Sequence, residues 1–406
     1  MAPRDPEGLV LQRDGDRGQA LIFTLDDVRY LQSSAGADAL AQVATCPLTD
    51  ATRIADVSAA RTRFGDRAGV LVETVLLRRR AAAKLGDAGD WLFTDEALQQ
   101  ATAAPVAAHR ARRLTGSTVH DVTCSIGTEL AVLRRTADVL GSDIDPVRLA
   151  MARHNVPGVP LIRADALRPV SRGTVVLADP ARRSGGRRVF APRDFSPPLD
   201  ALLDTYRDRN IVVKCSPGID FARLEFRGEV EVVSLSGEVR EACLWSPGLT
   251  EPRVSRRATV LGGDGSVEQV TDAHPDDCPV GPAGRWIIDP DGAVVRAGLV
   301  RQYAARYGLW QLDPKIAYLS GDGLPPATRG FEVLEQIPFG ERPLRQALAE
   351  MDCGAVEILV RGVDVDPAVL RRRLRLRGAR PLSVVITRIG AASSARATAF
   401  ICRPSR

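Results

Sequence analysis

Four aspartates stand directly after short apolar runs, and this pattern limits the fold more than any other feature of the chain. The first, Asp121, opens a loop of small residues, Asp121-Val-Thr-Cys-Ser-Ile-Gly-Thr-Glu129. Asp143, Asp165 and Asp179 follow at intervals of 22, 22 and 14 residues. Short apolar runs that end in a carboxylate are typical of parallel strands that deliver acids to one edge of a sheet. In open α/β sheets that edge is where ligands bind.

The composition is that of a folded protein with more than one domain. The chain has 406 residues, of which 45% are hydrophobic and 26% charged, and about 150 residues per domain predicts two or three domains. No apolar run reaches the roughly 18 residues that a bilayer span needs. The first residues also lack the apolar segment of a secretory signal. We therefore expect a cytoplasmic protein without membrane association.

Cysteine and charge patterns narrow the possible ligands. The seven cysteines are scattered and form no C-x-x-C pair, so neither a disulfide framework nor a metal site is indicated. The net charge is +5, and the basic residues are overwhelmingly arginine, whose planar fork suits phosphate. A GC-rich genome produces the same bias, so the charge permits an RNA partner without deciding for one. The oligomeric state is not indicated.

Two domains are predicted in the first part of the chain. Residues 1–115 predict a helical N-terminal domain, because 98–114 has few β-branched residues and Thr94 resembles a helix start. Residues 116–262 alternate between strand, small-residue turn and helix, which predicts an α/β fold with a mostly parallel, Rossmann-like sheet. The last strand candidates, up to residue 261, come without helices between them and predict an antiparallel end.

The rest of the chain predicts a connector and a small module. Residues 263–312 are a connecting segment in this interpretation, with a polar loop up to about residue 280. Residues 313–406 predict a small α+β domain with strands around a basic helix at 367–377. Candidate contacts to an RNA backbone on this helix are Arg371, Arg372, Arg373, Arg375 and Arg377. A solvated helix with its leucines packed inward explains the same pattern.

The first loop suits a ligand that approaches the backbone. Thr123, Cys124, Ser125 and Gly127 are all small. A dinucleotide site would need G-x-G-x-x-G for its pyrophosphate, whereas this loop has one glycine and ends in Glu129. An acid there repels a pyrophosphate but suits a cofactor with positive charge. This moves the prediction from NAD toward S-adenosylmethionine.

The later acids have places in such a site. Asp143, with Ile144 beside it, stands where an acid accepts hydrogen bonds from ribose hydroxyls. Asp165 and Ala166 would meet the adenine, and Asp179 would lie beside the sulfonium methyl. Taken singly, each acid fits a helix N-cap or a turn equally well.

Short motifs along the chain carry a family resemblance. They are Leu92-Phe-Thr-Asp-Glu-Ala-Leu98, Asp179-Pro-Ala-Arg-Arg183, Val213-Lys-Cys-Ser-Pro-Gly-Ile-Asp220, Ser236-Gly-Glu-Val-Arg-Glu-Ala242, Val295-Arg-Ala-Gly-Leu299 and Leu312-Asp-Pro314. Residues 117 to about 260 resemble a class I S-adenosylmethionine-dependent methyltransferase, in a bacterial group with a THUMP-like C-terminal module. The resemblance implies methyl transfer to a base in RNA, such as rRNA or tRNA. Ser125 and Glu129 depart from the family pattern, which has Gly and Asp there.

The same resemblance suggests catalytic residues. Asp179-Pro180-Ala-Arg182 is similar to the loop that holds an exocyclic amine in base-methylating enzymes, with Arg182 in the aromatic position. A guanidinium can stack on a base or pair with phosphate, although a solvated arginine fits as well. Lys214, at the end of the fifth predicted strand, is a candidate contact to a substrate phosphate. Since positioning can supply most of the catalysis, no metal is needed.

Three alternatives stay open. Cys215 stands before a Ser-Pro turn and could be a nucleophile, as in uridine-C5 methyltransferases, although a buried cysteine is commoner. The chain could also be a non-catalytic RNA-binding protein with a degenerate methyltransferase domain. It could, finally, methylate a small molecule or a protein.

Overall fold

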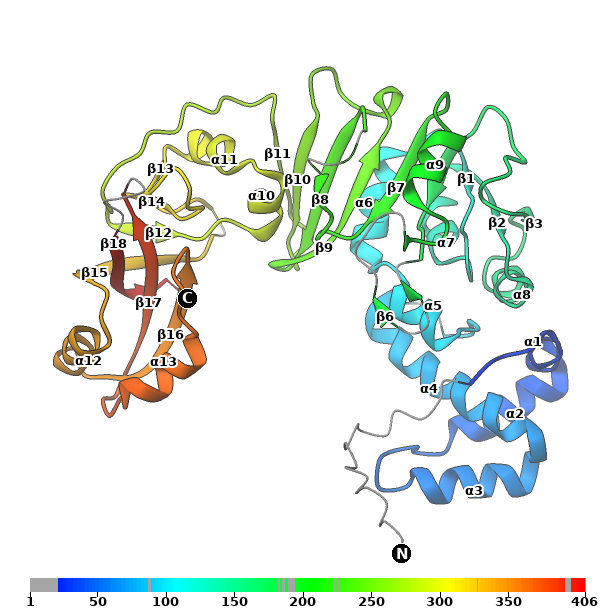
Figure 1. Cartoon of the computed structure of the whole chain (residues 1–406). Helices are drawn as coiled ribbons and strands as arrows, with labels where there is room; N and C mark the ends of the chain where they lie inside the picture. The colour runs from blue at the N-terminus through cyan, green and yellow to red at the C-terminus, as the bar shows by residue number, and fades with distance from the viewer. Residues whose placement is uncertain are drawn as a thin grey trace, which may run out of the picture. The chain divides into compact units, whose positions relative to one another are not determined.

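The computed structural model describes residues 21–86, 89–181, 183–184, 187–188, 194–221, 224, 226–326, 328–390 and 396–405. It divides into two compact units, Met1–Val170 and Ser171–Arg406. Figure 1 gives the element labels used below.

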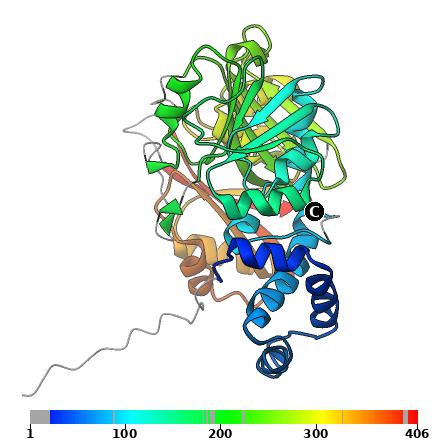
Figure 2. The same ribbon diagram turned by 90° about the vertical axis from the view of Figure 1, so that its right-hand side faces the viewer.

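Helices form the start of the first unit, as predicted (Figure 2). They are α1 (Leu25–Gln32), α2 (Ser34–Ala44), α3 (Arg53–Phe64), α4 (Ala68–Leu85), α5 (Asp95–Gln100) and α6 (Ala104–Arg113). Thr24 and Asp27 form a capping box at α1, and Thr94 caps α5 by accepting a hydrogen bond from the Ala97 N–H. The helix expected over 98–114 is interrupted before α6. Pro105 explains the break, because proline is tolerated only in the first turn of a helix.

Parallel strands with helices between them complete the first unit. The elements are β1 (Thr118–Asp121), α7 (Thr128–Leu133), β2 (Asp138–Asp143), α8 (Pro146–Asn155) and β3 (Leu161–Arg163), and β2 pairs in parallel with both β1 and β3. A Cβ at Gly141 would lie 2.6 Å from Cδ1 of Leu130. Glycine in β2 therefore allows α7 to pack closely on the sheet.

The second unit continues with a mixed sheet. Its strands are β4 (Val175–Ala178), β7 (Ile211–Cys215), β8 (Glu229–Leu235), β9 (Glu238–Trp245), β10 (Arg256–Leu261) and β11 (Val267–Thr271), in the order β11-β10-β8-β9-β7-β4. The β4–β7 and β8–β10 pairs are parallel, while β9 is antiparallel to β7 and β8, which confirms the predicted antiparallel strand. The loop expected up to residue 280 was wrong in part, because β11 pairs with β10 across backbone hydrogen bonds. Shorter elements here are β5 (Arg183–Ser184), β6 (Arg187–Arg188) and α9 (Leu199–Thr205).

The C-terminal α+β module uses strands from the segment predicted as a connector. Its sheet has the order β13-β14-β12-β15-β18-β17-β16. Its strands are β12 (Trp286–Ile288), β13 (Trp310–Gln311), β14 (Leu319–Gly321), β15 (Gly330–Pro338), β16 (Cys353–Arg361), β17 (Arg380–Ile389) and β18 (Arg396–Pro404), and its helices are α12 (Glu341–Glu350) and α13 (Pro367–Leu374). The helices α10 (Gly292–Ala297) and α11 (Val300–Tyr307) follow β12 in the chain, and α10 packs on β8 and β10. The pairing of β12 with β14 and β15 joins residues before 313 to this sheet.

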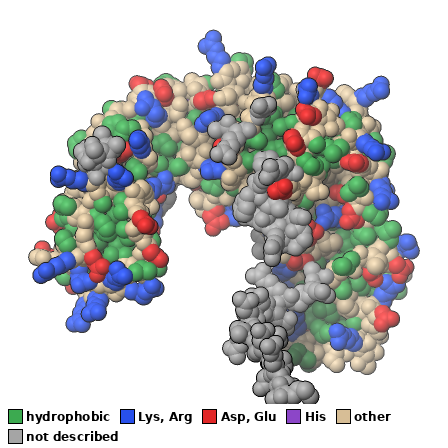
Figure 3. All heavy atoms as spheres, viewed as in Figure 1, with side chains coloured by type: hydrophobic (Ala, Val, Ile, Leu, Met, Phe, Trp, Pro, Cys, Tyr) green, Lys and Arg blue, Asp and Glu red, His purple; other side chains and the backbone are tan. Residues whose placement is uncertain are grey.

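The basic helix of the module is shorter than predicted. It ends at Leu374, and Arg375 has a φ of 49°, which takes the chain out of the helix. Arg375 and Arg377 therefore follow the helix instead of lying on it. All of the arginines predicted to meet RNA are nevertheless exposed, and Figure 3 shows basic side chains gathered over the end of the module where α12 and α13 lie.

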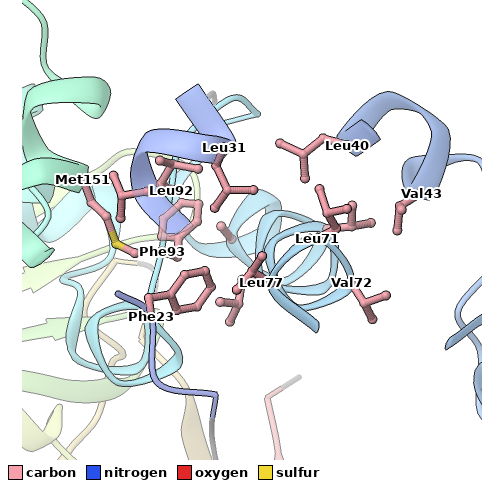
Figure 4. Close-up of a cluster of buried hydrophobic side chains, with 14 of the residues drawn as sticks. Phe23, Leu31, Leu40, Val43, Leu71, Val72, Leu77, Leu92, Phe93 and Met151 are labelled. Carbon is pink, nitrogen blue, oxygen red and sulfur yellow. The ribbon is translucent and has the colours of Figure 1, made fainter. Parts of the chain in front are cut away.

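The helices of the first unit share a core with α8. Leu71 and Leu77 of α4 pack with Leu31, Phe93 and Met151 (Figure 4). Ile126, from the small-residue loop after β1, belongs to the same cluster. This packing ties the N-terminal helices to the first loop of the predicted cofactor site.

The described residues contain neither a candidate membrane span nor a candidate metal site. No helix among them is long and apolar enough to cross a membrane. Nor do they contain a group of three or more His, Cys, Asp or Glu side chains placed to hold a metal ion.

Candidate active site

The loop after β1 is held by its own backbone and by one buried acid. Oδ1 of Asp121 accepts a hydrogen bond from the Thr123 N–H at 3.1 Å, and the Cys124 N–H donates to the Ser142 carbonyl at 2.9 Å. The Cys124 side chain packs among core residues, including Leu130. Burial raises the pKa of its thiol well above the usual value, and the nearby carboxylates of Asp121 and Asp143 add to this. The thiol is thus a core group in this loop.

Ser125 and Asp143 connect the loop to the end of β2. The Ser125 N–H donates to Oδ2 of Asp143 at 2.8 Å, and Oδ1 of Asp143 accepts from the Asp145 N–H at 2.8 Å. Burial raises the pKa of the Asp143 carboxyl, although these two hydrogen bonds oppose the shift. The structure therefore brings two predicted cofactor residues into direct contact.

Ser125 takes the backbone conformation that glycine would take most easily. Its φ is 50°, in the left-handed region, which costs a non-glycine residue about 1–2 kcal/mol. Gly127, two residues on, has a φ of 87°, and a Cβ there would lie 3.0 Å from Cγ2 of Val156. The loop keeps the tight geometry that the family pattern implies, with serine in place of glycine.

Replacing Ser125 by glycine is expected to raise the free energy of unfolding by about 0.5 kcal/mol, because relief of strain exceeds the added entropy of the unfolded chain. Ser125→Val should lower it by about 1–2 kcal/mol, since a β-branched residue tolerates positive φ poorly. Urea unfolding of both variants measures the two effects. A Ser125→Gly variant less stable than the parent would contradict the left-handed assignment.

Glu129 does not offer the unbalanced negative charge that the sequence suggested. Its Oε1 lies 3.0 Å from Nη2 of Arg110, and both side chains are buried, at 7% and 2% exposure. A second contact joins Arg110 Nε to Oε2 at 3.3 Å. The guanidinium therefore balances the carboxylate inside the protein, and a preference for a cationic cofactor cannot rest on Glu129.

The remaining predicted cofactor residues lie after β2 and β3. Ile144 is 64% exposed, although it follows directly on the buried Asp143. Oδ1 of Asp165 accepts from the Leu167 N–H at 2.9 Å, which makes a turn after β3, and Ala166 is buried in it. An exposed apolar side chain thus stands next to an acid at the end of β2.

Asn155 is a positioning residue that the sequence interpretation missed. Its Oδ1 accepts from the Leu92 N–H at 2.8 Å, and its Nδ2 donates to the carbonyls of Leu92 and Ile126, both at 2.9 Å. The amide therefore joins the motif before α5 to the loop after β1. An asparagine at the end of a helix has many ordinary roles, so its position in the sequence does not indicate these contacts.

Asn155→Ala is expected to lower the free energy of unfolding by about 3 kcal/mol, because three buried backbone groups lose their partner. Gln32→Ala is a matched control: Gln32 also donates to a backbone carbonyl, that of Ala150, but in an exposed position. It should change the stability by less than about 0.5 kcal/mol. Equal effects in urea unfolding would show that the Asn155 contacts carry little of the stability.

The second group of predicted residues lies in the second unit. Nζ of Lys214 lies 2.5 Å from Oδ2 of Asp179, and the Lys214 side chain is only 6% exposed. Pro180 is buried, and Ala181 exchanges two backbone hydrogen bonds with Ser196, at 2.8 and 3.0 Å. The Asp-Pro-Ala loop is thus anchored at both ends.

Of Arg182 and Cys215, which the sequence also singled out, the structure describes Cys215 alone. Arg182 lies outside the described residues. Cys215 is 2% exposed within β7, where it pairs with Ala242 of β9. Such burial is typical of a packing cysteine.

Known proteins identify the family. The chain is 67% identical over 360 residues to proteins of Mycobacterium tuberculosis, strains CDC 1551 / Oshkosh and ATCC 25618 / H37Rv, each named an S-adenosylmethionine-dependent methyltransferase. The match covers 85% of this chain and 100% of each relative. The chain belongs to the S-adenosylmethionine-dependent methyltransferases. Its cofactor is therefore S-adenosylmethionine, as predicted.

Two domain models and a solved structure also match the chain. The THUMP domain-like family matches residues 328–404, and a domain of unknown function matches residues 24–81. A crystal structure from Porphyromonas gingivalis W83, provisionally assigned as a methyltransferase, superposes with a TM-score of 0.70 at 19% identity. It covers 95% of this chain and 100% of its own. This similarity supports the predicted class I methyltransferase fold.

The predicted cofactor residues of the first unit lie in the loop after β1 and at the end of β2, and their chemistry can be compared with that of S-adenosylmethionine. Ser125 and Gly127 both have positive φ, which makes the tight turn that a loop near a ligand needs. Asp143 is an acid at the end of the second strand, suited to ribose hydroxyls. Ile144, beside Asp143, is an exposed apolar side chain that could pack against a part of the cofactor. The chemistry of these residues is compatible with S-adenosylmethionine, and their assignment to the cofactor stays a prediction.

Proposed function

We propose that this methyltransferase acts in the cytoplasm on a base in RNA, in rRNA or tRNA. The observation that carries the proposal is the Asp179–Lys214 ion pair, with a buried lysine and a half-buried carboxylate at the start of the Asp-Pro loop. The chain has only three lysines, at 84, 214 and 315. A compact ammonium in a chain that otherwise uses arginine supports a specific role for Lys214.

Asp179 has the chemistry to orient a nucleophile. Its carboxylate would accept a hydrogen bond from an exocyclic amine of the base and direct the nitrogen lone pair toward the methyl group. The Lys214 ammonium would hold the carboxylate in one orientation through their ion pair. When bound, S-adenosylmethionine supplies an electrophilic methyl group on a sulfonium sulfur. After transfer, Asp179 would take the proton that the amine loses.

Asp143→Ala is expected to weaken S-adenosylmethionine binding by at least about 10-fold, because a hydrogen bond to a charged group contributes about 1.5–3 kcal/mol. Asp138→Ala removes an exposed acid from the other end of β2 and should leave the affinity unchanged. Calorimetric titration of both variants measures the dissociation constants. Unchanged binding by Asp143→Ala would remove this residue from the proposed cofactor site.

The exposed arginines of the C-terminal module support RNA as the substrate class. Arg372 and Arg373 lie on the exposed surface of α13, while Arg371 also donates from Nε to the Val356 carbonyl at 2.9 Å. Guanidinium groups on one surface suit the phosphates of a nucleic acid, and binding through them falls steeply with salt. The match of this module to the THUMP domain-like family is consistent with RNA binding.

Transfer of a tritiated methyl group tests the substrate class. Total RNA and total protein from cells that lack the gene are incubated separately with the purified enzyme and labelled S-adenosylmethionine. We expect label in RNA, and less of it at high salt. Label in protein alone would refute the RNA assignment, and RNA binding without any label would support a non-catalytic role.

A further inference from the structure

One arginine of α10 holds the loop that follows β7. Nε of Arg296 donates to the carbonyl of Pro217, and its Nη2 donates to the carbonyl of Ile219 at 3.0 Å. The guanidinium also lies over the ring of Phe221, 5.8 Å from its centroid. A single side chain thus contacts three positions of the loop at 216–221.

The loop begins directly after Lys214 and Cys215. Two hydrogen bonds within the loop are short-range: the Ile219 N–H donates to the Ser216 carbonyl at 3.1 Å, and the Gly218 N–H donates to Ser216 Oγ at 3.3 Å. These bonds define a local turn. The contacts from Arg296 connect the loop to a helix that is distant in sequence, which hydrogen bonds within a local turn cannot do.

The helix that carries Arg296 is itself firmly placed. Asp291 caps α10 by accepting a hydrogen bond from the Ala293 N–H at 2.7 Å. Ala293 and Val294 are fully buried. A Cβ at Gly292 would lie 2.6 Å from Cγ2 of Val239, so this end of α10 packs tightly on β9. Because α10 is held in place, the contacts of Arg296 also fix the position of the loop relative to this helix.

We infer that Arg296 is a positioning residue for methyl transfer: it fixes the loop at 216–221 and, through the start of that loop, the Lys214 ammonium on Asp179. The inference rests on the proposed catalytic roles of Asp179 and Lys214. It gives the motif Val295-Arg-Ala-Gly-Leu299 a role. Arginine suits the task because its planar fork donates in two directions while its face stacks on an aromatic ring.

The lysine content of the chain allows a direct test. Protein labelled with ¹³C at lysine Cε gives signals from Lys84, Lys214 and Lys315, which Lys→Arg variants assign. Arg296→Gln should shift the Lys214 signal and leave the other two in place. Arg301→Gln is the matched control, since Arg301 lies on α11 in an exposed ion pair with Asp276. An unmoved Lys214 signal in Arg296→Gln would overturn the inference.

Kinetics separate positioning from general stability. With the RNA pool as substrate, Arg296→Gln should lower kcat by about 10- to 100-fold, with S-adenosylmethionine affinity and melting temperature close to the parent. Arg296→Lys should recover little, because an ammonium cannot make both bonds and the stacking contact. A parental kcat in Arg296→Gln would overturn the inference even if the Lys214 signal moves.

The same kinetic measurements distinguish an error in the proposed catalytic centre from an error in the role of Arg296. If Asp179→Asn and Lys214→Met both retain the parental kcat, the proposed catalytic centre is wrong. If those variants lose activity while Arg296→Gln keeps it, the centre stands and the positioning role of Arg296 is wrong.

Discussion

Replacing Asp179 by asparagine is expected to lower kcat for methyl transfer by at least about 100-fold, which is typical for loss of a group that orients and deprotonates a nucleophile. The amide has the same shape but no negative charge, and it cannot take a proton from the amine. It also removes the anion that lies 2.5 Å from the buried Lys214 ammonium. Steady-state kinetics with labelled RNA measure the loss.

Matched variants distinguish this effect from a general loss of charge. Lys214→Met keeps the length of the side chain but removes the ammonium, and it should lower kcat by a similar factor. Asp200→Asn makes the same chemical change as Asp179→Asn at an exposed position of α9 and should leave kcat unchanged. A parental kcat in Asp179→Asn would move the catalytic group elsewhere in the chain.

Affinity for S-adenosylmethionine should stay within about twofold of the parent in Asp179→Asn, because a group that acts mainly in the transition state changes kcat more than ground-state binding. Calorimetry checks this separately. A large loss of affinity with a modest loss of kcat would instead assign Asp179 to the cofactor, which the sequence also allowed.

The strands and helices of the chain could be predicted where the pattern was strong. The apolar runs before Asp121 and Asp143 form strands β1 and β2, and helices α7 and α8 alternate with them as the pattern predicted. Segments that depend on a partner strand were harder. The sequence around Val267–Thr271 is polar and indicates a loop. The segment forms strand β11 because it pairs with the edge of β10.

The pairing of site residues could not be read from their spacing. Lys214 was predicted to contact a substrate phosphate, yet its ammonium lies on Asp179, 35 positions earlier in the chain. Asp143 was predicted to bind the cofactor because it follows a strand. Its hydrogen bond from the Ser125 N–H, however, depends on the left-handed conformation of Ser125. Such contacts follow from the packing of whole elements, which local sequence does not specify.

Arg110 is a case in which the sequence did contain a signal. In α6, Val106, Ala107 and Ala111 are buried, and Arg110 lies on the same helical face. A charged residue in the middle of an apolar stripe predicts a buried partner of opposite charge. Glu129 has the same kind of position beside Leu130 and Leu133 of α7. Considered together, the two stripes indicate an ion pair.

Glu129→Ala is expected to lower the free energy of unfolding by about 3–5 kcal/mol, because it leaves the Arg110 guanidinium buried without this counter-charge. The pair has two contacts, at 3.0 and 3.3 Å, and both side chains are almost inaccessible to water. Urea unfolding measures the loss. Asp204→Ala, which breaks an exposed pair with Arg207, is the control and should cost less than about 1 kcal/mol.

The double variant Arg110→Met with Glu129→Leu should recover most of that stability, since a buried ion pair can often be replaced by apolar residues of similar volume. It also decides whether Glu129 acts on the cofactor. If Arg110 already balances the carboxylate, S-adenosylmethionine affinity in the double variant stays within about threefold of the parent. A loss of more than about 10-fold in a well-folded double variant would mean that Glu129 attracts the sulfonium after all, because removal of both charges then removes an interaction that the ion pair had not cancelled.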